Sequence, residues 1–168
     1  MLCPVLEQTC ELNSGRVICI QTDHVSDMWQ LIKPQIQISW SVVADKWAEP
    51  WTVTVGQWLR VYAATRGIKR SDVKKRITYF CQYFLLDEKH PVKNLTDKQL
   101  YYLSFAMALL VQPKVVVLQY SAVLSSEDCS RCARLIQKLR PAMAWLLISP
   151  EPHWLPGLSI DQIIGGES

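Results

Sequence analysis

The sequence lacks several features that would place it in a class at once. It has no run of 18 apolar residues, so no membrane-spanning helix is expected. Its first four residues show no basic stretch followed by an apolar core, so no signal peptide is expected. Strong charge is missing as well, because 18 Lys and Arg against 15 Asp and Glu leave a net +3. The composition therefore does not indicate a nucleic-acid binder.

Paired metal-ligand motifs are also missing. The chain has six cysteines, expected in a reducing compartment, and Cys129 and Cys132 form a C-x-x-C. No second C-x-x-C or paired His follows, so we expect no metal site and interpret the pair as neighbours at i and i+3 on a helix. Cys19 and Cys81 lie among apolar residues and are expected in the core.

What is present is globular composition, with 49% hydrophobic and 20% charged residues in 168. A single domain is the natural expectation. Apolar runs predict strands at about 17–20, 35–40, 114–118, 144–148 and 158–164. Helical periodicity predicts helices at about 23–32, from 54, and at 71–86, 96–112 and 126–139, with Asp23, Thr54, Ser71 and Thr96 as helix-opening or capping residues. This order predicts an α/β fold, a mostly parallel sheet flanked by helices.

An ordered series of segments resembles the ATP-binding subunit of ABC transporters, the ABC ATPase family. Residues 95–100, a buried helix and residues 112–118 resemble the LSGGQ signature loop, its helix and the strand that ends in the Walker B acids. Residues 11–20, 51–59 and 161–167 resemble the strand before Walker A, the start of the helical subdomain and a late strand with its turn. The order of the matches carries the resemblance, and it covers nearly the whole chain.

The resemblance implies a P-loop NTPase-like sheet with an inserted helical subdomain. The whole chain, 1–168, would be one ABC ATPase-like domain trimmed at both ends, with the helical subdomain at about 46–110. It also implies where ATP and Mg²⁺ would bind, and those positions can be checked one by one.

The stretch matching Walker A contains no glycine to curl backbone N–H groups around phosphate. Met28 stands in place of the lysine, and Trp29 in place of the Mg²⁺-binding hydroxyl. Asp23 and Asp27 add negative charge at the helix start, where Asp23 is expected to cap the N–H groups that should hold phosphate. The degenerate Walker A positions are Thr22, Asp23, His24, Asp27, Met28 and Trp29.

The remaining catalytic positions are replaced as well. Gln119 and Tyr120 stand where Walker B has its Asp and Glu, and neither can hold Mg²⁺ or act as a base at neutral pH. No histidine follows residues 146–149 at the switch position, and His153, a few residues later, is expected on the surface. Val42, Val43 and Ala44 stand where the Q-loop Gln is expected. The acids Glu127 and Asp128 are interpreted as the start of a helix.

The degenerate signature keeps Thr96 and Gln99 but has Asp97 and Lys98 in place of glycines. Thr96 and Gln99 also fit a capping box, which needs no nucleotide. Loss of one preorganised donor costs about 10²–10³-fold in rate, and here all the catalytic groups are replaced together. We therefore expect no catalytic residue, no cofactor and no ATPase activity.

The sequence predicts a pseudo-ATPase, an interaction or regulatory subunit associated with an ABC transporter. It would be cytoplasmic, peripheral at the membrane through a permease and without direct membrane insertion. Partners would be an ABC permease, an active ABC ATPase subunit or a second copy of the chain. The partner-binding candidates are Trp47, Trp51 and Trp58, which could instead fill the seam between the two subdomains.

Two other hypotheses remain. A nucleotide-binding protein or enzyme could use replacement residues in the degenerate site, namely Gln119, Tyr120, His24 and Asp27. Nucleic acid could bind the basic segment Arg66, Lys69, Arg70, Lys74, Lys75 and Arg76, although a solvated helix face explains these charges and no nucleic-acid partner is expected.

Overall fold

The computed structural model describes residues 13–32, 40–43 and 52–165, with side chains everywhere in these ranges except 40–43 and Arg70. The strands are β1 (Val17–Gln21), β2 (Trp40–Val43), β3 (Val115–Gln119), β4 (Ala144–Ser149) and β5 (Gln162–Ile164). The α-helices are α1 (Val25–Ile32), α2 (Val55–Thr65), α3 (Arg70–Tyr83), α4 (Asp97–Leu110) and α5 (Ser126–Leu139), with 3-10 turns η3 (Val92–Asn94) and η4 (Arg140–Ala142).

The chain divides into two compact units. The first combines Met1–Trp40 with Pro113–Ser168, and the second is Ser41–Gln112. The first unit holds α1, α5 and most of the sheet. The second holds α2, α3, η3 and α4, and we call it the helical unit.

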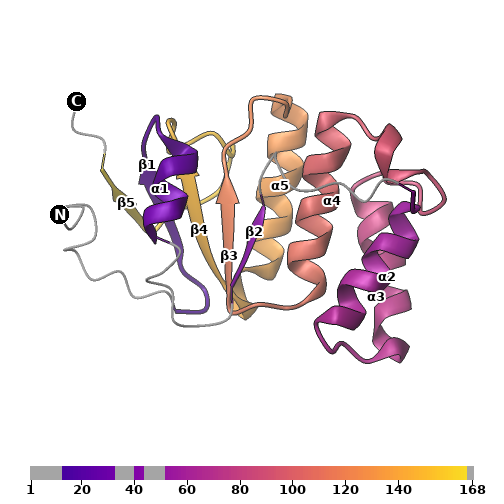
Figure 1. Ribbon diagram of the computed structural model, residues 1–168. Helices are drawn as coiled ribbons and strands as arrows, with labels where there is room; N and C mark the ends of the chain where they lie inside the picture. Colours follow the sequence, from indigo (N-terminus) through magenta and orange to yellow (C-terminus); the bar gives the residue numbers. More distant parts are fainter. Residues whose placement is uncertain (1–12, 33–39, 44–51, 166–168) are drawn as a thin grey trace. The chain divides into compact units, whose positions relative to one another are not determined.

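The sheet has the strand order β2-β3-β4-β1-β5, and β1 pairs in parallel with both β4 and β5, as β3 does with β4 (Figure 1). Every residue of β3 and β4 is buried, and so are the first four of β1. Continuous apolar runs such as Val115–Leu118 suit this position, because interior parallel strands are covered on both faces. The expected parallel α/β arrangement is therefore confirmed.

The arginine Arg140 joins three segments of the first unit that lie far apart in sequence. Its Nε donates to the Gly15 carbonyl at 2.5 Å, and its Nη1 to the Ser159 carbonyl at 3.2 Å. Its Nη2 lies 2.5 Å from Asp161 Oδ1, while Asp161 Oδ2 accepts the N–H of Val17 at 2.6 Å. The start of β1, the end of α5 and the chain before β5 are thereby held together.

The helical unit is built around α4, of which ten of 14 residues are buried. Phe84 packs on Tyr102 and Phe105, with ring centroids 5.1 and 5.2 Å apart. The indole N–H of Trp58 donates to Met107 Sδ at 3.2 Å. The longest helices have 14 residues, and in the part of the chain that the structure describes, none combines the length and hydropathy needed to span a bilayer.

Several sequence-based boundaries are wrong by a few residues. Helix α3 begins at Arg70, after Lys69, so Ser71 lies inside the helix and does not cap it. Strand β5 is confined to Gln162–Ile164, whereas a strand was expected from residue 158. The strand expected at 35–40 is described only from Trp40, and there it continues to Val43.

Candidate functional site

The carboxyl ends of β1, β3 and β4 meet at one edge of the sheet in the first unit. Gln21 is paired in register with Ser149, and Gln119 with Ile148. Ligands of open parallel sheets bind at this edge, beyond the carboxyl ends of the strands. The expected Walker A, Walker B and switch positions all follow these three strands, so this edge is the candidate site.

The turn from β1 into α1 is closed by the chain's own hydrogen bonds. Thr22 donates its N–H to the Ser149 carbonyl at 2.9 Å, and Thr22 Oγ1 accepts the N–H of His24 at 3.1 Å. The N–H of Met28 donates to the His24 carbonyl at 2.9 Å, so α1 begins two residues later than predicted. His24, whose carbonyl accepts this bond, is therefore the residue that precedes the helix, and the prediction that Asp23 is the N-cap is wrong.

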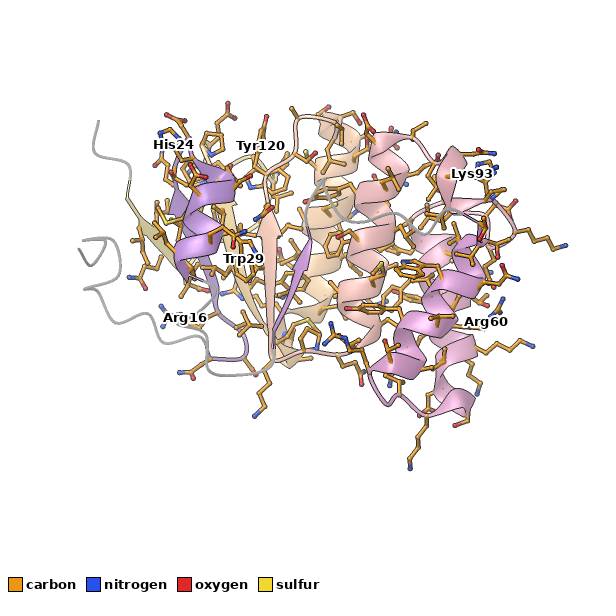
Figure 2. All side chains as sticks on the ribbon, viewed as in Figure 1. Arg16, His24, Trp29, Arg60, Lys93 and Tyr120 are labelled. Atoms are coloured by element: carbon orange, nitrogen blue, oxygen red, sulfur yellow. The ribbon has the colours of Figure 1, made fainter. Side chains whose placement is uncertain are left out.

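In the stretch matched to Walker A, the polar side chains are exposed to solvent and the apolar side chains are buried in the core. Met28 is 9% exposed and Trp29 is 7% exposed, so both belong to the core, whereas Asp23, His24 and Asp27 are exposed. In Figure 2, His24 lies at the start of α1 and Trp29 further along the same helix. The two positions matched to the phosphate-binding lysine and the Mg²⁺-binding hydroxyl therefore carry buried apolar side chains.

The end of β3 carries an aromatic pair that the sequence did not reveal. The N–H of Tyr120 donates to the Ile148 carbonyl at 2.8 Å, which extends the strand pairing by one residue. The Tyr120 ring meets the ring of Trp154 edge-on, with centroids 5.4 Å apart and planes at 79°. Trp154 is 7% exposed and Gln119 is 9% exposed. The two residues matched to Walker B are thus a buried amide, Gln119, and an aromatic residue in contact with Trp154.

The turn after β4 is also internally bonded. Ser149, which is fully buried, donates its hydroxyl to the Glu151 carbonyl at 2.7 Å and accepts the Glu151 N–H at 3.0 Å. Gln21 Nε2 donates to the Pro150 carbonyl at 3.2 Å. His153 is exposed, as expected. The chain at the switch position is therefore anchored to β1 and to itself.

The signature position lies in the helical unit, where Thr96 caps α4. Its Oγ1 accepts the Gln99 N–H at 3.3 Å, and Gln99 Oε1 accepts the Thr96 N–H at 3.0 Å. This confirms the predicted capping box. Asp97 and Lys98 are exposed on the first turn.

The expected Q-loop residues need a correction. Val42 and Val43 belong to β2 rather than to the loop after it, and Ala44 lies outside the described residues. The sequence from Ala44 to Trp51 contains no glutamine, so moving the expected loop to follow β2 still supplies none.

The acids Glu127 and Asp128 are in the first turn of α5. Asp128 Oδ2 accepts the Ser125 N–H at 3.1 Å and the Ser125 hydroxyl at 2.6 Å, and Ser125 Oγ accepts the Asp128 N–H at 3.3 Å. This is a third capping box, after those of Thr54 and Thr96. Asp128 is used within the helix start, as the sequence indicated.

Among the described residues, the cysteine thiols have raised pKa values. Burial raises the pKa of the Cys19 and Cys132 thiols to about 12, and burial also raises that of Cys129. Over residues 13–32, 40–43 and 52–165, no group of three or more His, Cys, Asp or Glu is placed to hold a metal ion.

The partner-binding candidates are only partly described. Trp47 and Trp51 lie outside the described residues. Trp58 is half-buried, and its N–H already has the Met107 acceptor within the helical unit. The Trp58 side chain therefore has a hydrogen-bond partner within the helical unit itself.

Comparison with known proteins identifies solved structures with the same fold. No protein-family profile matches the chain, and no curated protein sequence matches it. Among solved structures, a transporter described as an ABC transporter of the metal-chelate type, in an inward-facing conformation, has a TM-score of 0.72 at 15% identity, over 93% of this chain and 72% of that one. The fold is that of an ABC ATPase.

Two further structures share the ABC ATPase fold. The cbiO1 protein of Clostridium perfringens, part of the ABC transporter complex cbiONQ, gives a TM-score of 0.68 at 15% identity over 92% of this chain and 75% of that one. An ATP-binding subunit of an ABC transporter gives 0.71 at 10% identity over 83% and 70%. The parallel sheet flanked by helices agrees with this fold, and the edge described above is where the resemblance placed the site.

Proposed function

We propose that this protein is a catalytically inactive ABC ATPase-like protein that works through contacts with other proteins. It would be an interaction or regulatory subunit associated with an ABC transporter. Its place would be in the cytoplasm, peripheral at the membrane through a permease. Its partner would be that permease, an active ABC ATPase subunit or a second copy of itself.

The observation that carries this proposal is the aromatic pair of Tyr120 and Trp154 at the carboxyl edge of the sheet. ATP hydrolysis needs cations around the phosphates and a carboxylate that orients the attacking water. At the matched positions this edge offers the buried Met28, the amide of Gln119 and the ring of Tyr120. None of these groups supplies a positive charge, a Mg²⁺ ligand of adequate strength or a base.

The internally bonded turns support the same conclusion. A phosphate cradle needs backbone N–H groups that point at the ligand and have no other partner. Here the N–H groups of Thr22, His24 and Glu151 donate to acceptors of the protein itself. Binding phosphate at these groups would require breaking the hydrogen bonds that close both turns.

The test is calorimetric titration with Mg-ATP together with a phosphate-release assay, using an active ABC ATPase subunit as the positive control. We expect no saturable heat and no phosphate release above a buffer blank. Micromolar binding would replace this proposal with the alternative, a nucleotide-binding protein or enzyme that uses His24, Asp27, Gln119 and Tyr120.

The interaction role needs a separate measurement. Size-exclusion chromatography with light scattering, alone and with a co-expressed permease and ATPase subunit, should show a complex. A clean monomer that binds neither subunit would contradict the interaction role, whatever the ATP titration gives.

A further inference from the structure

A pocket of about 530 Å³ lies in the first unit, between α5 and the chain that follows β4. We call it the α5 pocket, and its lining residues are Ala133, Arg134, Gln137 and Lys138 of α5 with Pro156 and Gly157 of that chain. Ala133 is 3% exposed and forms an apolar floor, whereas the other five lining residues are exposed. The pocket is therefore open to solvent, and its lining residues are separate from the carboxyl edge of the sheet.

One wall of the pocket is a face of α5. The four helix residues are spaced i, i+1, i+4 and i+5, so they share one side of the helix. Leu135 and Ile136, between them, are fully buried and hold the other side in the core. Arg134 and Lys138 are therefore presented to solvent by a helix that is itself packed against the sheet unit.

The opposite wall is a turn whose ends are anchored in the core. Leu155 is 3% exposed and Leu158 is 7% exposed, and the N–H of Leu158 donates to the Leu155 carbonyl at 3.2 Å. Pro156 and Gly157 are exposed between them. Gly157 has φ of 76°, and a Cβ placed on it would meet no atom within 4 Å, so the space beside the turn is open. Both walls are thus in place before anything binds, which lowers the cost of binding.

The charge of this surface is positive. From residue 129 to residue 140 the sequence has four Lys or Arg and no acid. Arg131 has a salt bridge of 3.6 Å with the preceding turn of α5, and Arg140 makes the contacts described above. The other two cations, Arg134 and Lys138, line the pocket. Their Cβ atoms are about 5–6 Å apart on one helix face, so both can reach neighbouring carboxylates of a single ligand.

The openness of the pocket favours part of a protein over a free small molecule. Small-molecule sites enclose about 70–90% of their ligand, and here only the floor residue is buried. Ala133 and Pro156 offer aliphatic contact for one apolar side chain, with the two cations and the Gln137 amide beside it.

We propose that the α5 pocket binds an acidic segment of a partner protein, in which an apolar side chain is flanked by two carboxylates. The apolar side chain would rest on Ala133 and Pro156, and the carboxylates would meet Arg134 and Lys138. This rests on the interaction role proposed above, and it names the chemistry of one surface that performs it.

The experiment measures fluorescence anisotropy of a labelled peptide with the central order Glu-Leu-Glu between Gly-Ser ends. We expect saturable binding below about 1 mM that weakens as salt is added. The peptide with Gln-Leu-Gln at its centre should bind about tenfold or more weakly, because the ion pairs are lost. The peptide with Glu-Gly-Glu should bind about fivefold or more weakly, because the apolar contact is lost.

A matched pair of double variants locates the site. Arg134→Gln with Lys138→Gln should weaken binding about tenfold or more. The control, Arg60→Gln with Lys93→Gln, removes one Arg and one Lys that are exposed on the helical unit, where Figure 2 shows both, and it should change binding less than about twofold. Gln137→Glu keeps the size of an exposed side chain but adds a negative charge between the two cations, so it should weaken binding about fivefold.

Three results would overturn the proposal. Absence of saturation up to millimolar peptide would mean that the pocket does not bind such a segment. Equal weakening by both double variants would mean a non-specific response to net charge. Displacement of the peptide by inorganic phosphate at equal concentration would mean a small-anion site.

Amide chemical-shift mapping on the unaltered protein covers the case in which a variant fails to fold. Shifts should concentrate on residues 133–138 and 157–158, and shifts elsewhere would contradict the pocket. The co-expression measurement separates this proposal from the interaction role. A complex without peptide binding would leave the interaction role standing and reject the α5 pocket, whereas peptide binding without a complex would do the reverse.

Discussion

At the scale of single residues, Tyr120 stands at the position matched to the Walker B glutamate and packs against Trp154. A glutamate there would have to leave its carboxylate beside the Trp154 ring, and it would lose the edge-on contact at 5.4 Å. We expect Tyr120→Glu to lower the free energy of unfolding by about 1–3 kcal/mol. Urea unfolding followed by circular dichroism measures this change.

The matched control for that variant is Tyr120→Phe. It keeps the ring and its contact with Trp154, so the loss should stay within about 0.5 kcal/mol. If Phe and Glu cost the same, the aromatic contact does not stabilise this edge of the sheet. Tyr120→Glu should also leave phosphate release at the blank, because one carboxylate cannot replace the other missing groups.

The thiol of Cys132 gives a pH-dependent prediction. Burial raises its pKa from 9.0 to about 12, so from pH 9 to pH 12 the unfolded chain loses a proton that the folded chain keeps. The contribution of this thiol to the free energy of unfolding is present below pH 9 and is lost as the pH rises toward 12. The slope is up to about 1.4 kcal/mol per pH unit.

Urea unfolding of the reduced protein at pH 8, 9 and 10 tests this, compared with Cys132→Ala. Other titrating groups are common to both proteins, so the variant should show a shallower fall in stability above pH 9. Parallel pH dependences would show that the thiol is more accessible to solvent than its full burial indicates.

At the scale of secondary-structure elements, the capping box of α4 accounts for Thr96 and Gln99 without a nucleotide. Thr96→Ala should lower the free energy of unfolding by about 1 kcal/mol, because the Gln99 N–H loses its acceptor. Thr96→Ser keeps the hydroxyl and should change stability by only a few tenths of a kcal/mol. Thermal unfolding of the two variants makes the comparison, and an equal loss in both would contradict a capping role.

The end of α3 carries a strained residue. Leu85 has φ of 56°, the left-handed region that usually takes glycine after a helix, and it is 70% exposed. Leu85→Gly should raise the free energy of unfolding by about 0.5–1 kcal/mol, since it removes the strain and few core contacts. Leu85→Ala keeps a Cβ and should gain nothing. Chemical denaturation distinguishes them, and a loss in the Gly variant would show that the leucine side chain contributes contacts.

Elements with a local signal were predictable from the sequence. The bounds 126–139 for α5 agree with the structure, because Ser125 and Asp128 form a cap within four residues. Ser71 misled the prediction for α3, because a serine can cap a helix or lie within its first turn. Leu158 and Ile160 are apolar yet precede β5, and the carbonyl of Ser159 between them accepts a hydrogen bond from Arg140. Because Arg140 lies 19 positions away, this contact leaves no local signal in the sequence.

The candidate site was predictable only in part, because some of its contacts join residues that are far apart in the sequence. The residues matched to the Walker motifs can be identified from the sequence alone. The contact of Tyr120 with Trp154 joins two turns, after β3 and after β4, that only the parallel sheet brings together. The first residue of α1 is Val25, so the capping rule that predicted Asp23 as the N-cap was applied one residue too early.

At the scale of the whole molecule, Arg140 connects distant segments of the first unit, and its substitution measures how much these bonds stabilise the fold. It hydrogen-bonds Gly15, Ser159 and Asp161, the first of which lies 125 residues away. Arg140→Lys keeps the charge but cannot reproduce the planar set of donors, so it should lose most of these bonds. We expect a fall of about 2–3 kcal/mol in the free energy of unfolding, measured in urea.

The matched control is Arg134→Lys on α5, the helix that ends just before Arg140, where the exposed side chain should tolerate the change within about 0.5 kcal/mol. Hydrogen exchange adds a local measurement. In Arg140→Lys the N–H of Val17, which Asp161 accepts at 2.6 Å, should exchange faster, because Asp161 loses its partner. Unchanged protection at Val17 together with unchanged stability would mean that the strand pairing of β1 with β4 and β5 holds this edge without Arg140.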